Sequence, residues 1–171
     1  GAVIGKLLEE KAESLFRNPV LIAATLGGFG LILLAADRYG RRRKDLDQIR
    51  LVDALWIGIS QAMAIIPGIS RSGVTIAAGL GLGYRREAAA CFSFLMSIPI
   101  ILGAGMVKMG HFHDDVGYAG LAVGFLASAI SGFFSIKYLL RFIARHDFRS
   151  FVWYRFALAA LILAVFILRG R

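Results

Sequence analysis

Long uncharged apolar runs alternate with short charged segments along this chain. An α-helix rises about 1.5 Å per residue, so about 20 apolar residues cross a hydrocarbon core of about 30 Å. Runs that are long enough for spanning helices cover residues 18–36, 88–107, 116–136 and 151–168. The pattern therefore predicts an all-α, polytopic membrane protein in which residues 1–171 form a single membrane domain.

The segment 54–84 has a different pattern. Its two apolar halves are each too short for a comfortable span, and they are separated by Arg71 and interrupted by Pro67 and Gly68. Irregular backbone at membrane depth persists only where protein or a water-filled cavity satisfies its N–H and C=O groups. We therefore predict a re-entrant helical hairpin over 54–84 that lines a polar pocket.

Residues 1–17 carry charges of both signs together with apolar side chains at helical spacing. This mixture favours an amphipathic helix lying at the membrane surface, and a connecting segment is an equally good interpretation. The sequence has neither an initiator Met nor a signal-peptide pattern near its start. We therefore expect it to be part of a longer chain.

Composition agrees with a membrane protein, because 58% of the residues are hydrophobic and 18% are charged. The net charge of +9 does not indicate a nucleic-acid partner, since Lys and Arg cluster in loops rather than along one helix face. The positive-inside rule places the basic segments 38–50 and 137–149 on the cytoplasmic side and the hairpin apex toward the outer face. The single cysteine, Cys91, excludes an internal disulfide and a multi-cysteine metal site.

Candidate chemistry gathers in the sequence PGISRSGVT, residues 67–75. Ser70 stands where an N-cap would start a helix, and the free N–H groups and positive dipole of a helix N-terminus favour an anion. The fork-shaped guanidinium of Arg71 suits phosphate oxygens, and Ser72 and Thr75 add hydroxyls that we expect to converge on the same site. The residues therefore predict phosphate binding.

Other polar residues allow more than one interpretation. Gln61 could orient a water, a metal ligand or a phosphate oxygen, or it could form a hydrogen bond between helices. Arg155 lies near the predicted end of a span, so we expect its guanidinium to extend to the lipid headgroups and assign it no catalytic role. Glu87 fits an interfacial ion pair better than a general base. Surface positions are expected for the three histidines, His111, His113 and His146.

Four features carry a resemblance to a known family: Gln61, PGISRSGVT at 67–75, REAA at 86–89 and FSFLMSIPIILGAG at 92–105. They resemble the undecaprenyl-diphosphate phosphatase family, which is associated with bacitracin resistance. The resemblance implies two inverted repeats, each with a re-entrant hairpin, of which this chain holds the second.

The resemblance also implies a function. Family members are multi-pass enzymes of the bacterial inner membrane, and they hydrolyse undecaprenyl diphosphate to the monophosphate and inorganic phosphate, which recycles the carrier of cell-wall synthesis. The implied partner is a polyprenyl diphosphate lipid, and a homo-oligomer is compatible with the family. The residues implied to act in catalysis are Ser70, Arg71 and Thr75. The residues implied to bind substrate are Gln61, Gly68 and Ser72.

The family's first repeat, with its acidic segment and its histidine, has no counterpart in this sequence. By resemblance those groups hold a divalent cation, Mg²⁺ or Ca²⁺, so we expect no metal ligands in this chain and little activity from it alone. A transporter or flippase of polyprenyl phosphates is the alternative, because broken helices and midplane anion sites also occur in transporters. Phosphate release distinguishes the two functions.

Overall fold

The computed structural model describes residues 18–109 and 117–169, and these ranges are helical, apart from their connections, with no strand. An isolated β-bridge joins Lys44 to Tyr84. The predicted surface helix at 1–17 and the histidines His111 and His113 lie outside the described residues.

The described helices follow one another in a simple order. They are α2 (Pro19–Tyr39), α3 (Leu51–Gln61), α4 (Arg71–Gly81), α5 (Arg86–Leu95), α6 (Ser97–Met109), α7 (Gly117–Arg145) and α8 (Arg149–Arg169), with short 3₁₀ helices η1 (Leu46–Gln48) and η2 (Ala62–Ile65). The helical segments that are long and apolar enough to cross a membrane are Pro19–Tyr39, Arg86–Val107, Ala119–Arg145 and Arg149–Arg169. The all-α, multi-pass prediction is therefore confirmed.

Two details of the helices differ from the expected pattern. The segment Arg86–Val107 is broken at Met96, because Pro99 lacks the N–H that would continue the hydrogen bonding of α5. Helix α7 continues to Arg145, so the expectation of a loop over 137–149 was wrong for most of that segment. Charged side chains are compatible with a helix that extends beyond the hydrocarbon core, and hydropathy alone does not show where such a helix ends.

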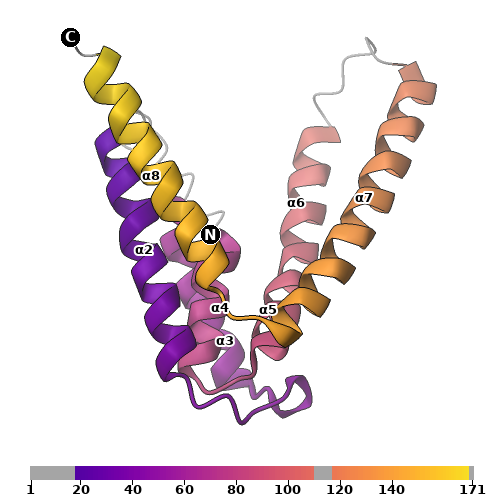
Figure 1. Cartoon of the computed structure of the whole chain (residues 1–171). Coiled ribbons are helices and arrows are strands. Elements are labelled where there is room, and N and C mark those ends of the chain that lie inside the picture. Colours follow the sequence, from indigo (N-terminus) through magenta and orange to yellow (C-terminus); the bar gives the residue numbers. More distant parts are fainter. Residues whose placement is uncertain (1–17, 110–116, 170–171) are drawn as a thin grey trace.

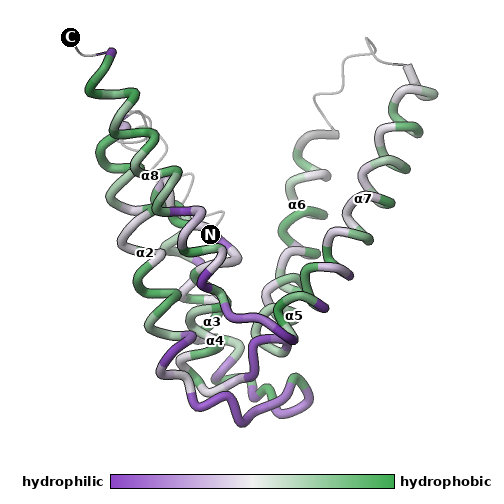
Figure 2. Tube along the Cα trace, viewed as in Figure 1, coloured by the Kyte–Doolittle hydropathy of each residue, from purple (hydrophilic) through white to green (hydrophobic). Residues whose placement is uncertain are grey.

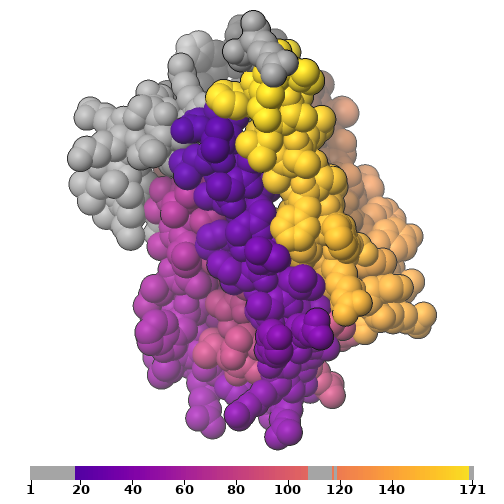
Figure 3. Space-filling view, turned by 60° about the vertical axis from the view of Figure 1, so that its left-hand side comes forward, coloured from indigo at the N-terminus to yellow at the C-terminus, as the bar shows by residue number. Residues whose placement is uncertain are grey.

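The helices form two arms that diverge from a shared base (Figure 1). Helices α2 and α8 lie side by side in one arm, as the space-filling view also shows (Figure 3), and α6 and α7 belong to the other. Hydrophilic residues gather at the base, where the connections between helices lie (Figure 2). We call this region the polar base.

A buried core at the junction fixes the hairpin between the arms. Leu80 and Ala90 are fully buried there, and a Cβ on Gly79 would lie 2.9 Å from the Cβ of Ala89, so α4 and α5 are in close contact. Helix α4 also packs against α2 and α3. By contrast, α7 exposes apolar side chains such as Phe125, as expected of a surface that faces lipid.

Helices α3 and α4 form a helical hairpin joined by η2 and the loop 66–70. The far end of α4 lies at the polar base, because Lys44 N donates to Gly83 O at 3.0 Å and Arg85 N donates to Lys44 O at 2.9 Å. An 11-residue helix is about 16 Å long, so the N-terminus of α4 lies about half a hydrocarbon core away from that end. The re-entrant placement in a bilayer stays a prediction.

Candidate anion-binding site

The loop before α4 is shaped by one glycine. Gly68 has φ +84°, and a Cβ there would lie 2.1 Å from Thr25 Oγ1 and 2.7 Å from Ile22 O. The hydroxyl of Thr25 in α2 donates to Pro67 O at 2.6 Å. The loop is therefore held against α2 at a spacing that only glycine allows.

Ser70 caps α4 as predicted. Its backbone is extended, with φ −69° and ψ 124°, and its Oγ accepts a hydrogen bond from Gly73 N at 3.2 Å. The N–H groups of Arg71 and Ser72 have no partner within the part of the chain that the structure describes. These N–H groups and the helix dipole make the first turn of α4 suitable for an anion.

The two serine hydroxyls face a pocket of about 430 Å³. Ser70 Oγ and Ser72 Oγ lie 3.3 Å apart, and both residues line the pocket together with Gly68. Most of the remaining lining is apolar and comes from α2, α4, α5, α7, α8 and the connections beside them: Leu26, Leu33, Ile69, Ile76, Phe94, Leu139, Ile143, Phe148 and Phe151. The polar end of this pocket is therefore the N-terminus of α4.

Arg155 lies at this polar end, contrary to the expectation from sequence. The residue is only 8% exposed, and its guanidinium donates to Leu26 O at 3.1 Å and to Gly68 O at 2.9 Å. A Cβ on Gly73 would lie 3.5 Å from Arg155 Nη1, so the guanidinium also borders the first turn of α4. The prediction that Arg155 extends to the headgroups was wrong, because α8 packs on α2 and the side chain turns inward.

Arg71 and Thr75 lie on the face of α4 that packs on α5. Arg71 Nη1 donates to Ser93 O at 3.3 Å, and the hydroxyls of Thr75 and Ser93 lie 2.7 Å apart. Thr75 is 1% exposed, and its hydroxyl is also 3.0 Å from Arg71 O, one turn earlier. Neither Arg71 nor Thr75 lines the pocket. The structure therefore brings Ser70, Ser72 and Gly68 to the pocket, whereas the side chains of Arg71 and Thr75 contact α5.

Gln61 is the last residue of α3, and it does not line the pocket. Its Oε1 atom is buried and has no hydrogen-bond partner among the residues described. The hydrogen bond between helices that we considered is therefore not formed through this oxygen within the described ranges.

The ion pairs at the polar base differ from the one expected for Glu87. Arg86 forms a two-pronged ion pair with the buried Asp37, and Arg85 lies 3.3 Å from Asp45. Glu87 is exposed and makes no ion pair within residues 18–109 or 117–169, so its interpretation as an ion-pair partner was wrong for these ranges. The exposed His146 stacks on Phe142, as a surface histidine can.

Comparison with known proteins gives a consistent result. The chain matches the family described as bacitracin resistance protein BacA over residues 1–161. It is 52% identical over 170 residues to an undecaprenyl-diphosphatase of Moorella thermoacetica. The aligned region covers 99% of this chain and 65% of that protein. It is 47% identical over 159 residues to an undecaprenyl-diphosphatase of Geobacter metallireducens, covering 90% and 59%.

A further relative has a similar extent. An undecaprenyl-diphosphatase of Caldicellulosiruptor bescii is 46% identical over 173 residues, covering 99% of this chain and 65% of that protein. The chain thus spans less than two thirds of the length of these relatives. The family match and these identities over nearly the whole chain agree with the motifs at Gln61 and 67–75. The chain belongs to the bacitracin resistance protein BacA family.

Proposed function

We propose that this chain supplies part of the active site of a membrane phosphatase that converts undecaprenyl diphosphate to undecaprenyl phosphate and inorganic phosphate. One observation carries the proposal: the first turn of α4, in which the N–H groups of Arg71 and Ser72 have no partner among the described residues, lies beside the guanidinium of Arg155 at the polar end of an apolar pocket. This arrangement suits an anionic headgroup on an apolar tail. The names of the relatives support the same substrate.

The phosphate that reacts would bind at the open end of α4, rather than deep in the pocket. The first turn of α4 carries several hydrogen-bond donors together. They are the N–H groups of Arg71 and Ser72, the hydroxyl of Ser72 and the guanidinium of Arg71. Phosphoryl transfer spreads negative charge over the equatorial oxygens of the transferred group, and preorganised donors stabilise that charge. Arg71 and the helix N-terminus would therefore act on the transition state.

Two nucleophiles fit this geometry: a water molecule and Ser70 Oγ. Within the described ranges, the hydrogen bonds of Ser70 Oγ go to Gly73 N and Ser72 Oγ, and neither partner is a general base. If Ser70 attacks, its hydroxyl gives up the capping bond, its proton would pass to a base outside the described residues, and water would later hydrolyse the phosphoserine. In both routes the bond between the terminal phosphorus and the bridging oxygen breaks, and the prenyl monophosphate leaves with that oxygen.

A requirement for Mg²⁺ or Ca²⁺ is a separate part of the proposal. The groups around Ser70 are hydroxyls, backbone N–H groups and guanidinium groups, without the carboxylates that usually hold Mg²⁺ or Ca²⁺. No group of three His, Cys, Asp or Glu side chains that could hold a metal occurs in residues 18–109 and 117–169. We therefore derive no step through a metal, and we propose that carboxylates outside the described residues hold it.

The proposed location is the bacterial inner membrane, with the polar base on the cytoplasmic side. The base carries Arg41, Arg42, Arg43 and Lys44, so the positive-inside rule supports this orientation. The N-terminus of α4 would then lie at about mid-membrane depth and open toward the outer face.

Release of inorganic phosphate from a short-chain polyprenyl diphosphate tests the proposed reaction. The protein is assayed in detergent with Mg²⁺, both as this chain and extended to the length of its relatives. We expect phosphate release from the extended form and little from this chain alone. A lipid carrier without hydrolase activity would release none in either form, which would favour the transporter interpretation.

A further inference from the structure

A second pocket, of about 380 Å³, lies at the polar base between the end of α2 and the start of α8. Four arginines line it, and each comes from a different segment: Arg38 from α2, Arg42 from the following connection, Arg86 from α5 and Arg149 from α8. Asp37 and Asp147 also line it. We call it the basal pocket, and it is separate from the candidate phosphatase site at the other end of α4.

Asp37 organises the basal pocket. This carboxylate is 2% exposed, and it accepts two hydrogen bonds from Arg86 and one from Phe148 N at 3.2 Å. Arg42 Nη2 lies 3.3 Å from the same carboxylate. A buried carboxylate with this many donors fixes the ends of α2, α5 and α8 relative to one another. The arginines are therefore held in place before any ligand arrives.

Positive charge remains in excess after these pairs are formed. The two aspartates offset only two of the four arginines. Among the described residues, Arg38 is exposed and makes no ion pair, and the ion pair of Arg149 is with Asp147, two positions earlier, at 3.2 Å. Arg42 has an unusual backbone, with φ +48°, and its Nε atom is buried without a hydrogen-bond partner among the described residues. Donors and charge are thus available for an anion.

The remaining wall of the basal pocket is apolar and includes Leu34, Val152, Trp153 and Phe156. Trp153 is 70% exposed, and it lies one turn into α8, where aromatic side chains commonly mark the membrane surface. The pocket therefore combines cations and an apolar wall at the depth of lipid headgroups. A soluble phosphate would use the cations alone, whereas a phospholipid would use both.

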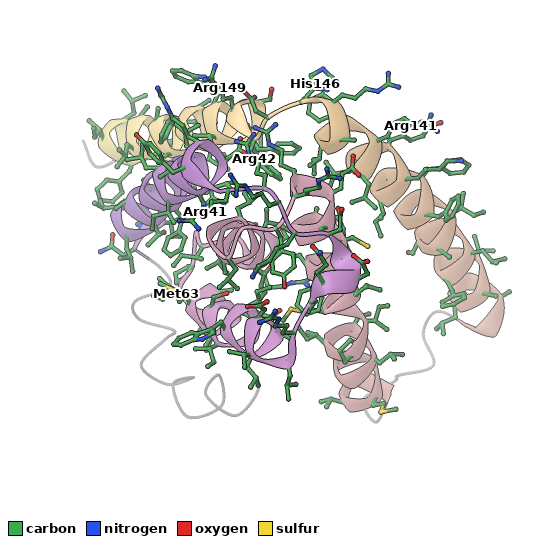
Figure 4. All side chains as sticks on the ribbon, turned by 90° about the horizontal axis from the view of Figure 1, so that it is seen from below. Arg41, Arg42, Met63, Arg141, His146 and Arg149 are labelled. Carbon is green, nitrogen blue, oxygen red and sulfur yellow. The ribbon has the colours of Figure 1, made fainter. Side chains whose placement is uncertain are left out.

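We propose that the basal pocket binds the phosphodiester headgroup of an anionic phospholipid from the cytoplasmic leaflet, with the start of an acyl chain against Trp153. Arg38, Arg42 and Arg149 hold the phosphate, and Arg86 remains engaged with Asp37. Figure 4 shows Arg42 beside the end of α2 and Arg149 over the start of α8, whereas Arg141 lies away from them on α7. The proposal does not depend on the phosphatase activity.

Quenching of Trp153 fluorescence tests the proposal. The protein carries Trp56→Phe, so that Trp153 is the remaining tryptophan, and it is titrated in detergent with phosphatidylglycerol that has brominated acyl chains. Brominated phosphatidylcholine and inorganic phosphate serve as competing probes. We expect phosphatidylglycerol to bind more tightly than phosphatidylcholine, and millimolar inorganic phosphate to leave the quenching unchanged.

The double variant Arg38→Gln/Arg149→Gln removes two lipid-facing charges and leaves the Asp37 pairs intact. At about fivefold per charge near a membrane surface, the affinity for phosphatidylglycerol should fall about 25-fold. The control Arg141→Gln/Arg145→Gln removes the same charge from the exposed side of α7 and should change the affinity by less than about twofold. The variant Arg38→Lys/Arg149→Lys should retain most of the affinity.

Three results would overturn the proposal. Equal losses of phosphatidylglycerol affinity in the two glutamine variants would mean that the lipid is attracted by the overall surface charge. Equal affinities for phosphatidylglycerol and phosphatidylcholine would mean that the pocket does not distinguish headgroup charge. Displacement of the lipid by inorganic phosphate would mean that the pocket is a site for a soluble anion.

Discussion

Two residues far apart in sequence shape the loop before α4. Gly68 supplies the positive φ and the absence of a side chain, and Arg155 donates to its carbonyl from α8. Both act on the backbone that precedes the Ser70 cap. The position of the anion site therefore depends on contacts that reach across the hairpin from α2 and α8.

Gly68→Ala should be strongly destabilising, because the new Cβ would overlap Thr25 Oγ1 and the backbone would be strained. We expect a loss of about 2–5 kcal/mol, from strain and overpacking together. Thermal denaturation in detergent measures it. The control is Gly28→Ala, where nothing lies within 4 Å of the new Cβ, and this change in a helix interior should be neutral or slightly stabilising. Similar melting temperatures for the two variants would contradict the account of the loop.

Arg155→Lys should keep the charge and lose the fork that reaches both Leu26 O and Gly68 O. If Arg155 positions the loop, the kcat for phosphate release should fall about 100-fold, because small displacements of a site have effects of this size. The KM should change little. The control Arg141→Lys should leave both constants unchanged. Near-normal kcat in Arg155→Lys would mean that the positive charge alone matters.

At the residue scale, the sequence predicted what depends on local chemistry. The Ser70 cap followed from residue type and from its position before an apolar run. Arg155 could not be predicted in the same way, because its partner Gly68 lies 87 residues earlier and its place near the start of a span is also typical of an interfacial arginine. The burial of Thr75 depends on Ser93 in another helix, so its sequence spacing from Arg71 was not informative.

The hairpin is fixed at its base by a polar contact between its two ends. Tyr84, which follows α4 and is fully buried, donates to Asp53 Oδ2 near the start of α3 at 2.5 Å, and Lys44 Nζ lies 3.5 Å from the same oxygen. Burial, followed by the hydrogen bond to Asp53, raises the pKa of Tyr84 to about 12, so the phenol remains a donor at neutral pH.

Tyr84→Phe should destabilise the protein by about 1–3 kcal/mol, because it leaves a mostly buried carboxylate without its shortest hydrogen bond. The measurement is thermal denaturation in detergent, with Tyr138→Phe as the control on the exposed surface of α7. An unchanged melting temperature for Tyr84→Phe would show that this contact does not hold the hairpin.

At the scale of elements, hydropathy located the long helices but not all of their limits. The break at Met96 follows from Pro99, which the sequence displays, yet the apolar run continues through it without interruption. Helix α7 continues to Arg145, and the charged residues in its last turns led us to expect a loop there. The two halves of the hairpin were expected from Pro67 and Gly68, since these residues interrupt the apolar pattern.

The whole molecule joins two arms at a polar base (Figure 1), and residues of both α7 and α8 line the pocket beside the N-terminus of α4. Apolar patterning predicted the membrane class, but it could not show that α2 pairs with α8. That pairing depends on shape: a Cβ on Gly30 would lie 3.5 Å from Phe156, so the two helices approach closely. Lipid-facing and helix-facing apolar residues look alike in sequence.

The central claim is that the N-terminus of α4 and Arg71 stabilise the transferred phosphate. The most direct test is the kcat for inorganic phosphate release by Arg71→Ala in the protein extended to the length of its relatives, compared with Arg141→Ala. Loss of a preorganised donor to the transition state lowers kcat by about 10²–10³-fold, and we expect a loss of this size for Arg71→Ala. The control should keep its rate. Near-normal hydrolysis by Arg71→Ala, with the protein folded, would contradict the assignment of this helix terminus as the catalytic anion site.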